Sequence, residues 1–307
     1  MTAYLKVLKS LKLKAKAAQK ETKPHKQKVR KLKEIKGDVM AGKQVTITDI
    51  LQNRVNMYSF ISRLFIKEVD QEFLDKLNSM KFPKNTQNAN VDAGYELIRT
   101  FLNTADVNVL NVLAVDYVHA FIGSGVSGYS AAYPYESVYT SPKRLMMQEA
   151  RDEMLALYKA AGLAKKDSWK EGEDHIALEL EYMAILAQRS VDEYEKGDED
   201  AAITLLVQQR NFLEDHLFAW YPMMEADIQK FAKTNFYKGT GKLALGFLEC
   251  DKELLDDILS DVDFEDESAA ARQKAKEEAD VKAKEQEQNK QGKAKEAEES
   301  EAQNDAE

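Results

Sequence analysis

The stretch Glu171-Gly172-Glu173-Asp174-His175 runs directly into Ile176-Ala177-Leu178-Glu179-Leu180-Glu181-Tyr182-Met183, so that a charged turn precedes an apolar-periodic segment. Asp is a preferred N-cap residue, and acidic groups at a helix start are favoured by the helix dipole. We therefore expect Asp174 to cap a helix over about 174–195. A second polar stretch, Tyr133-Pro134-Tyr135-Glu136-Ser137-Val138-Tyr139, stands at another expected helix boundary. Helix ends leave backbone N–H groups available to a ligand, so function is expected at these two stretches.

Apolar residues recur at helical spacing through the middle of the chain, without sustained strand-like alternation. Residues 106–121 are apolar on nearly every face, which predicts a central helix. Pro142 and Pro222 are expected at or before helix starts, because an interior proline breaks the hydrogen-bond ladder. The sequence thus predicts an all-α fold, a single helical-bundle domain of about nine helices. They are expected at about 48–65, 70–80, 91–103, 106–121, 142–161, 174–195, 199–219, 223–234 and 237–259.

The composition is typical of a globular protein from a reducing compartment of the cell. The chain has 307 residues, of which 44% are hydrophobic, and a single cysteine, Cys250, so no internal disulfide can form. No run approaches the roughly 20 apolar residues that a membrane span needs. The N-terminus has neither the compact apolar region nor the cleavage site of a secretory signal. We expect a cytoplasmic protein without a membrane span.

Charge is strongly segregated along the chain and suggests three regions. Residues 1–43 contain 14 Lys and Arg against 3 Asp and Glu, whereas residues 261–307 contain 16 acidic against 8 basic residues, which leaves a net −12 for 44–260. We expect a basic N-terminal extension over 1–45, a helical domain over 46–262 and an acidic, low-complexity, disordered tail over 263–307. A nucleic-acid-binding body is not expected.

The N-terminal extension begins with leucines and a valine spaced among lysines, at Leu5, Val7, Leu8, Leu11 and Leu13. Such a stretch is typical of a mobile solvated arm, or of a basic amphipathic segment for a membrane surface or a partner. Both readings stay open. In either case the two termini are expected to add little to the packed core.

Motifs for catalysis and cofactors are weak. Gly123–Gly128 matches G-x-G-x-x-G, but a helix precedes it where dinucleotide binding needs a strand. Gly239-Thr240-Gly241-Lys242 lacks the upstream glycine and the following Ser or Thr of a phosphate loop. The histidines at 175 and 216 lack the Glu-x-x-His spacing of a helical metal site. We expect no enzyme, no cofactor and no metal.

Aromatic residues gather around the two polar stretches, at Tyr117, Phe121, Tyr133, Tyr135 and Tyr139. Together with the acidic turn they suit a basic, apolar peptide. The alternative is that these aromatics only pack loops onto the core. A non-catalytic helical scaffold or interaction module would then be the function.

Four segments occur together in a recognisable order: Asp116-Tyr117-x-x-Ala120-Phe121-x-Gly123, Pro134–Tyr139, Glu171–Met183, and Phe212-Leu213-x-x-His216-Leu217-x-x-Trp220. Together, over about 50–255, they resemble the TorD family of redox-enzyme maturation chaperones, related to DmsD and NarJ. The resemblance implies an all-helical cytoplasmic chaperone, as a monomer or a domain-swapped dimer. It implies binding of the twin-arginine signal peptide, and of the body, of a molybdopterin oxidoreductase, which delays export until the cofactor is inserted.

The resemblance also implies which residues lie in or beside the peptide-binding region: Tyr117, Phe121, Pro134, Tyr135, Ser137, Tyr139, Asp174 and His175. One departure concerns the acidic turn, where the family pattern has Pro and this chain has Gly172. Glycine there is expected to loosen the hinge between the two helical halves. The charged termini have no counterpart in the family pattern.

Overall fold

The computed structural model describes residues 39–40, 43–44, 46–123 and 130–260. The expected acidic tail lies outside the described residues, as does the N-terminal extension apart from a short antiparallel hairpin. Its strands are β1 (Val39–Met40) and β2 (Lys43–Gln44), in which Val39 pairs with Gln44. Most of the Gly123–Gly128 motif also lies outside the described part.

The rest of the described chain is helical. Its elements are α3 (Ile47–Ile66), α4 (Gln71–Ser79), α5 (Ala89–Asn103), α6 (Val109–Tyr117), the π-helix η1 (Val118–Ile122), α7 (Glu136–Thr140), α8 (Glu149–Ala160), α9 (Ile176–Lys196), α10 (Glu199–Phe212), the π-helix η2 (Leu213–Leu217), α11 (Phe218–Phe231) and α12 (Asn235–Leu259). Since η1 continues α6, and η2 joins α10 to α11, the described residues form nine continuous helices. The expected all-α fold is confirmed.

Helix α3 begins at Ile47, one residue before the start that the sequence suggests. Thr46 is its N-cap, and its hydroxyl accepts the backbone N–H of Asp49 at 3.1 Å while the Asp49 carboxylate accepts the N–H of Thr46 at 2.9 Å. This reciprocal capping box satisfies two donors at the helix start. Thr48, two residues later, also stands before an apolar run but lies inside the helix.

Helix α3 packs on α9, and a buried ion pair ties it to α12. Arg54 Nε lies 2.6 Å from Asp251 Oδ1, and both side chains are fully buried. The hydroxyl of Tyr58 donates to the same carboxylate at 2.6 Å. Hydrogen bonds from two neighbours offset the large cost of burying a carboxylate.

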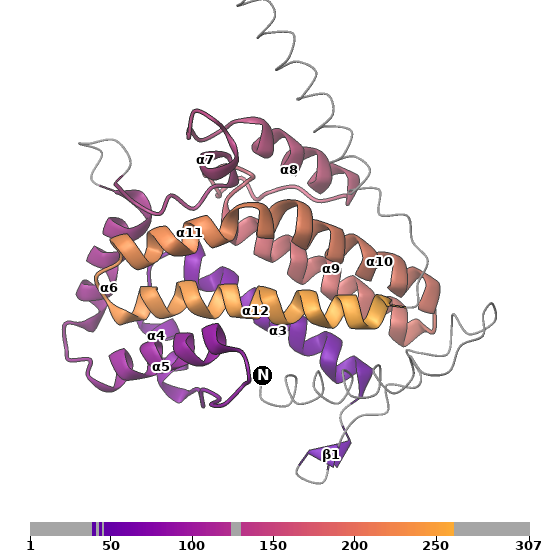
Figure 1. The fold of residues 1–307 in the computed structure, drawn as a ribbon, viewed down its shortest axis with the longest axis horizontal. Coiled ribbons are helices and arrows are strands. Elements are labelled where there is room, and N and C mark those ends of the chain that lie inside the picture. Colours follow the sequence, from indigo (N-terminus) through magenta and orange to yellow (C-terminus); the bar gives the residue numbers. More distant parts are fainter. Residues whose placement is uncertain (1–38, 41–42, 45, 124–129, 261–307) are drawn as a thin grey trace, which may run out of the picture. The chain divides into compact units, whose positions relative to one another are not determined.

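Helices α5 and α12 approach closely because glycines face the contact. A Cβ at Gly94 would lie 2.6 Å from the backbone N of Leu243, and one at Gly246 would lie 2.5 Å from the backbone N of Val91. A Cβ at Gly239 would similarly meet the carbonyl oxygen of Gly94 at 2.7 Å. The glycine that begins the phosphate-loop look-alike at 239–242 therefore serves helix packing. Figure 1 shows α5 beside α12, with α7 and α8 on the other side of α11.

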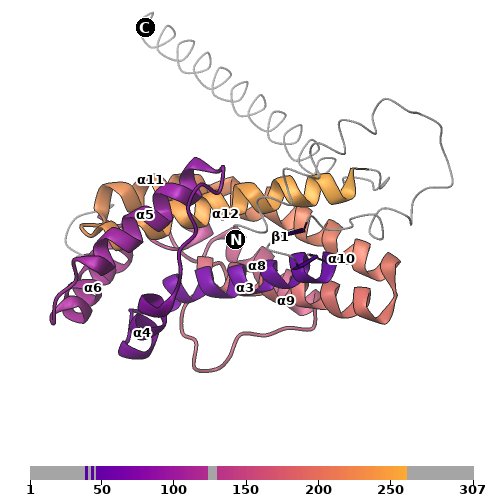
Figure 2. The same cartoon turned by 90° about the horizontal axis from the view of Figure 1, so that it is seen from below.

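The expectation of a central helix over 106–121 is wrong. Of α6, only Leu113, Asp116 and Tyr117 are buried. Its outward face carries Val112 and Val115, the latter 71% exposed. Figure 2 shows α6 at one end of the helical array. An apolar composition on all faces predicts a buried helix only where partners exist to cover every face.

The two expectations for proline placement are also wrong. Pro222 lies inside α11, and the expected break there is absent because α10, η2 and α11 run on continuously. Proline lacks an N–H, so the carbonyl of Phe218 loses its usual partner directly after the π-helical turn. Pro142 lies in a turn, and the helix that it was expected to open begins at Glu149.

Candidate functional site

The two polar stretches of the sequence meet in space. Tyr135 and His175 form an isolated antiparallel β-bridge, in which the N–H of Glu136 donates to the carbonyl of Asp174 at 3.0 Å. The N–H of Ile176 donates to the carbonyl of Pro134 at 2.9 Å. This bridge sets the starts of α7 and α9 side by side.

The N-cap of α9 differs from the sequence prediction. His175, and not Asp174, is the N-cap of α9, where its Nδ1 accepts the N–H of Ala177 at 3.1 Å. Asp174 instead caps α7, because its Oδ2 accepts the N–H of Ser137 at 3.0 Å. A Cβ at Gly172 would lie 2.7 Å from Asp174 Oδ1, so glycine leaves room for this carboxylate.

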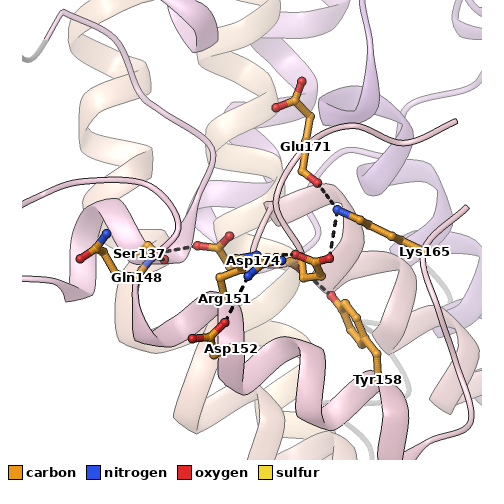
Figure 3. Close-up of polar contacts among 9 residues, drawn as sticks. Ser137, Gln148, Arg151, Asp152, Tyr158, Lys165, Glu171 and Asp174 are labelled. Atoms are coloured by element: carbon orange, nitrogen blue, oxygen red, sulfur yellow. Dashed lines mark hydrogen bonds and ion pairs between the residues drawn. The ribbon is translucent and has the colours of Figure 1, made fainter. Parts of the chain in front are cut away.

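Glu173 ties α8 to the same turn, and Figure 3 shows its partners Arg151, Tyr158 and Lys165 around this turn. Its carboxylate lies 2.7 Å from Arg151 Nε and 3.0 Å from Lys165 Nζ, and its backbone carbonyl accepts the hydroxyl of Tyr158 at 3.0 Å. Burial opposes ionisation, but the ion pairs with Lys165 and Arg151 still lower the pKa of Glu173. In addition, the N–H of Gln148 donates to Ser137 Oγ at 3.1 Å. Helices α7, α8 and α9 therefore share one polar junction.

All eight residues that the resemblance implicates are buried. Tyr135 and Trp169 pack edge-on against the His175 ring, and Tyr139 stacks on Trp220 with the ring centroids 5.5 Å apart. Burial lowers the pKa of His175 to about 3, so its imidazole is neutral. These side chains support a surface from within, and neither Asp174 nor His175 is exposed on it.

Tyr117 and Phe121 belong to a separate aromatic cluster beneath η1. Their rings are 5.2 Å apart, and both contact Tyr237 of α12. The hydroxyl of Tyr117 donates to the carbonyl of Phe65 at 2.8 Å. The N–H of Ala132 donates to the carbonyl of Ala120, which links this cluster to the segment that leads into α7.

A buried polar network lies behind α7. His216 Nδ1 of η2 lies 3.0 Å from Glu136 Oε2, and the Trp220 indole N–H donates to Glu179 at 3.1 Å. Burial disfavours the imidazolium of His216, but the hydrogen bond and charge of Glu136 outweigh it and raise the pKa of His216. Burial, followed by the charges of Glu136 and Asp174, raises the pKa of Glu179. In the described residues no set of three His, Cys, Asp or Glu side chains is arranged to hold a metal ion.

In front of this network lies a cavity of about 500 Å³ between α7 and α8 on one side and η2 and α11 on the other, which we call the α7/α11 groove. Its lining residues are Glu136, Thr140, Ser141, Pro142, Lys143, Gln148, Glu149, Ala150, Glu153, Asp215 and Ala219. Four carboxylates and one lysine give it an acidic character. Its size is in the range of small-ligand pockets, and it suits a few side chains of a longer peptide.

Exposed apolar side chains border this groove. Leu145, Met146 and Met147 are 48–62% exposed, and they lie between the lining residues Lys143 and Gln148. On the opposite side, Met223 is 44% exposed and follows the lining residue Ala219 by one helical turn, on the same face of α11. Flexible, polarizable methionines recur on surfaces that bind varied apolar partners.

Several residues predicted from the sequence hold α7, one wall of this groove, whereas most of the lining residues are not predicted. Ser137 and Tyr139 lie on α7, and Asp174 caps it, but the exposed carboxylates of Glu149 and Glu153 were not singled out. The sequence does not distinguish them, because acidic residues in the first turns of a helix such as α8 are common wherever they stabilise the helix dipole.

The described residues thus define an all-α protein with an acidic groove bordered by exposed methionines. Residues 85–226 match the protein family described as Nitrate reductase delta subunit. The chain is also similar to chaperone protein TorD of Vibrio cholerae serotype O1 strain El Tor Inaba N16961, with 27% identity over 218 residues, 68% of this chain and 95% of that protein. Chaperone protein TorD of Psychrobacter sp. strain PRwf-1 is 28% identical over 214 residues, 67% of this chain and 92% of that protein.

The chain is a distant homologue of the TorD chaperones, a family of redox-enzyme maturation chaperones, over most of its length. The resemblance recognised from the sequence is confirmed. This is a non-catalytic chaperone family, so the prediction that the chain is not an enzyme is confirmed by its relatives. None of the helices in the described part of the chain combines the length and apolar character that crossing a bilayer requires.

Proposed function

We propose that this chaperone acts in the cytoplasm, where it binds the twin-arginine signal peptide of a molybdopterin oxidoreductase in the α7/α11 groove and delays export until the cofactor is inserted. The observation that carries the proposal is the pairing of two chemistries at one site. Glu149, Glu153 and Asp215 line the groove, and exposed Leu and Met side chains border it. A peptide with two arginines beside an apolar stretch presents the complementary groups.

The acidic lining selects arginine for a physical reason. A planar guanidinium can donate two parallel hydrogen bonds to one carboxylate, whereas a lysine ammonium acts as a point charge. Electrostatic attraction speeds the encounter and orients the peptide, and burial of its apolar stretch against Met146 and Met223 slows its release.

The buried residues implicated by the resemblance contribute by holding the groove in shape. Asp174 fixes the start of α7, on which Glu136 and Thr140 line the groove. Tyr139 fixes the other end of α7 by stacking on Trp220 of α11. We therefore assign Ser137, Tyr139, Asp174 and His175 a positioning role at the peptide site, with Pro134 and Tyr135 in the supporting β-bridge. Tyr117 and Phe121 support the segment that leads into it.

Titration of the full-length protein with a labelled twin-arginine signal peptide tests the proposal. Glu153→Gln combined with Asp215→Asn should weaken binding by about tenfold or more, because a hydrogen bond to a charged group contributes roughly 1.5–3 kcal/mol. Glu193→Gln combined with Glu195→Gln removes the same charge near the end of α9 and should leave affinity within about twofold. Absence of saturable binding by folded protein, or equal losses in both double variants, would contradict the proposal.

A further inference from the structure

We propose that the N-terminal arm of this same chain, residues 4–16, occupies the α7/α11 groove in the absence of a client and thereby acts as a built-in competitor of the signal peptide. This inference rests on the proposed function, because both place a basic, apolar peptide in the same groove.

The arm has the chemistry that the groove selects. Residues 4–16 contain lysines at 6, 9, 12, 14 and 16, interleaved with Leu5, Val7, Leu8, Leu11 and Leu13. The stretch contains no acidic residue, and the first one in the chain is Glu21. Among the regions outside the described residues, the acidic tail lacks such an apolar pattern. The arm is therefore the segment of this chain that matches a cationic, apolar ligand.

The groove offers the complementary surface. Glu149 and Glu153 are exposed carboxylates on α8, and Asp215 lies across from them on η2. The exposed side chains of Met146 and Met223 border the groove from its two sides. The body carries a net charge of −12 over 44–260, so the long-range field also attracts the arm, which lies within an excess of 11 positive charges over 1–43.

The connection allows this contact. Between Leu13 and Val39, where the described hairpin begins, lie 25 residues. Fully extended, such a segment spans up to about 90 Å. Because arm and groove belong to one chain, the contact is intramolecular, and its effective concentration compensates for the small area that a short arm buries.

The regulatory consequence follows from mass action. An arm that occupies the groove about nine-tenths of the time lowers the apparent affinity for any other peptide about tenfold. A client signal peptide with two arginines outcompetes the arm because lysines form single point contacts where arginines form paired ones. The groove is thereby covered in the free chaperone, which shields exposed methionines from nonspecific partners.

Two sets of full-length variants separate the arm's apolar-basic stretch from its general charge. Lys6, Lys9, Lys12 and Lys14 are all changed to Gln in one variant, which should bind a labelled twin-arginine peptide about tenfold more tightly than the native protein. The matched control changes Lys26, Lys28, Lys31 and Lys33 to Gln, removing the same charge outside the stretch, and should leave affinity within about twofold. Unchanged affinity in the first variant, or an equal gain in both, would overturn the inference.

A second measurement does not depend on signal-peptide binding. Leu8→Cys combined with Met223→Cys should form an intramolecular disulfide under mild oxidation, whereas Leu8→Cys combined with Lys196→Cys, at an exposed site near the end of α9, should not. The native Cys250 is buried and does not interfere. Equal cross-linking at both sites, or none at Met223, would overturn the inference. Selective cross-linking in a protein that binds no twin-arginine peptide would support the arm contact and contradict the proposed function.

Discussion

Asp174 Oδ2 accepts the backbone N–H of Ser137 at 3.0 Å, across 37 positions of sequence, and thereby caps a helix other than the one that it precedes. Both residues are fully buried. The bond couples the acidic turn to α7, the helix that forms one wall of the α7/α11 groove. The site is thus organised by long-range capping, and the stability of the turn and the shape of the groove depend on each other.

Asp174→Ala should lower the free energy of unfolding by about 2 kcal/mol, because a buried N–H then loses its acceptor at a cost of roughly 1–3 kcal/mol. Asp174→Asn retains an acceptor oxygen and should lose much less. Asp167→Ala, at an exposed aspartate of the same loop, is the control and should change stability by less than about 0.5 kcal/mol. Chemical denaturation of the three variants checks this. If the Ala and Asn variants are equally stable, the acceptor oxygen of residue 174 does not contribute to stability, which contradicts the proposed cap.

The sequence predicts where α9 begins and that both polar stretches stand at helix boundaries, because helical periodicity and capping preferences are local. It does not predict which carboxylate caps which helix, since the partner of Asp174 is distant in sequence. The pairing of Arg54 with Asp251 cannot be predicted from the sequence either, because these two residues are also distant in sequence. Each stands in a helical segment where a charge normally faces solvent, and only the packing of α3 on α12 reveals the pairing.

The exposure of α6 is not predictable from its composition, because composition does not reveal whether a partner is present to cover each face. Leu113→Ala, at the buried face, should cost about 2–5 kcal/mol through lost contacts and a cavity. Val115→Ala removes a comparable apolar group from the 71% exposed face and should change stability by less than about 0.5 kcal/mol. Thermal and urea unfolding of this matched pair provide the measurement. A large loss from Val115→Ala would show that its face is covered.

His175 should make the protein sensitive to acid. Its pKa is lowered from 6.5 to about 3 in the folded protein by burial, so the unfolded state binds more protons between these values. Stability is therefore present above about pH 6.5 and is lost as pH falls toward 3, by roughly 2 kcal/mol between pH 7 and pH 5. The raised pKa of His216 acts with the opposite sign, because its contribution is lost as pH rises.

His175→Asn isolates the first effect, because asparagine is also a good N-cap and does not titrate. The variant should be less stable at pH 7, where it lacks the ring contacts with Tyr135 and Trp169, but should lose less stability on acidification than the native protein does. His216 is present in both proteins and cancels from the difference in slope. Parallel stability-versus-pH curves would show that His175 is not the acid-sensitive group.

The buried pair of Arg54 and Asp251 should be costly to break and dispensable to replace. Asp251→Ala removes the carboxylate that pairs with the buried Arg54 guanidinium and should lower stability by about 3–5 kcal/mol, whereas Arg54→Met combined with Asp251→Leu should recover much of that loss. The control is Glu193→Ala, which breaks the exposed pair with Lys196 and should cost less than about 1 kcal/mol. If Asp251→Ala and Glu193→Ala cost the same, the pair is not functioning as a buried one.

The most direct test of the central claim is to map where a bound signal peptide lies. A twin-arginine peptide carrying a photoreactive group in its apolar stretch should cross-link to the full-length protein at the 145–147 segment and at Met223, and an excess of unlabelled peptide should abolish the products. Cross-links that fall instead on the exposed valines of α6, or that form equally with a peptide in which both arginines are replaced by alanine, would contradict the assignment of the α7/α11 groove as the signal-peptide site.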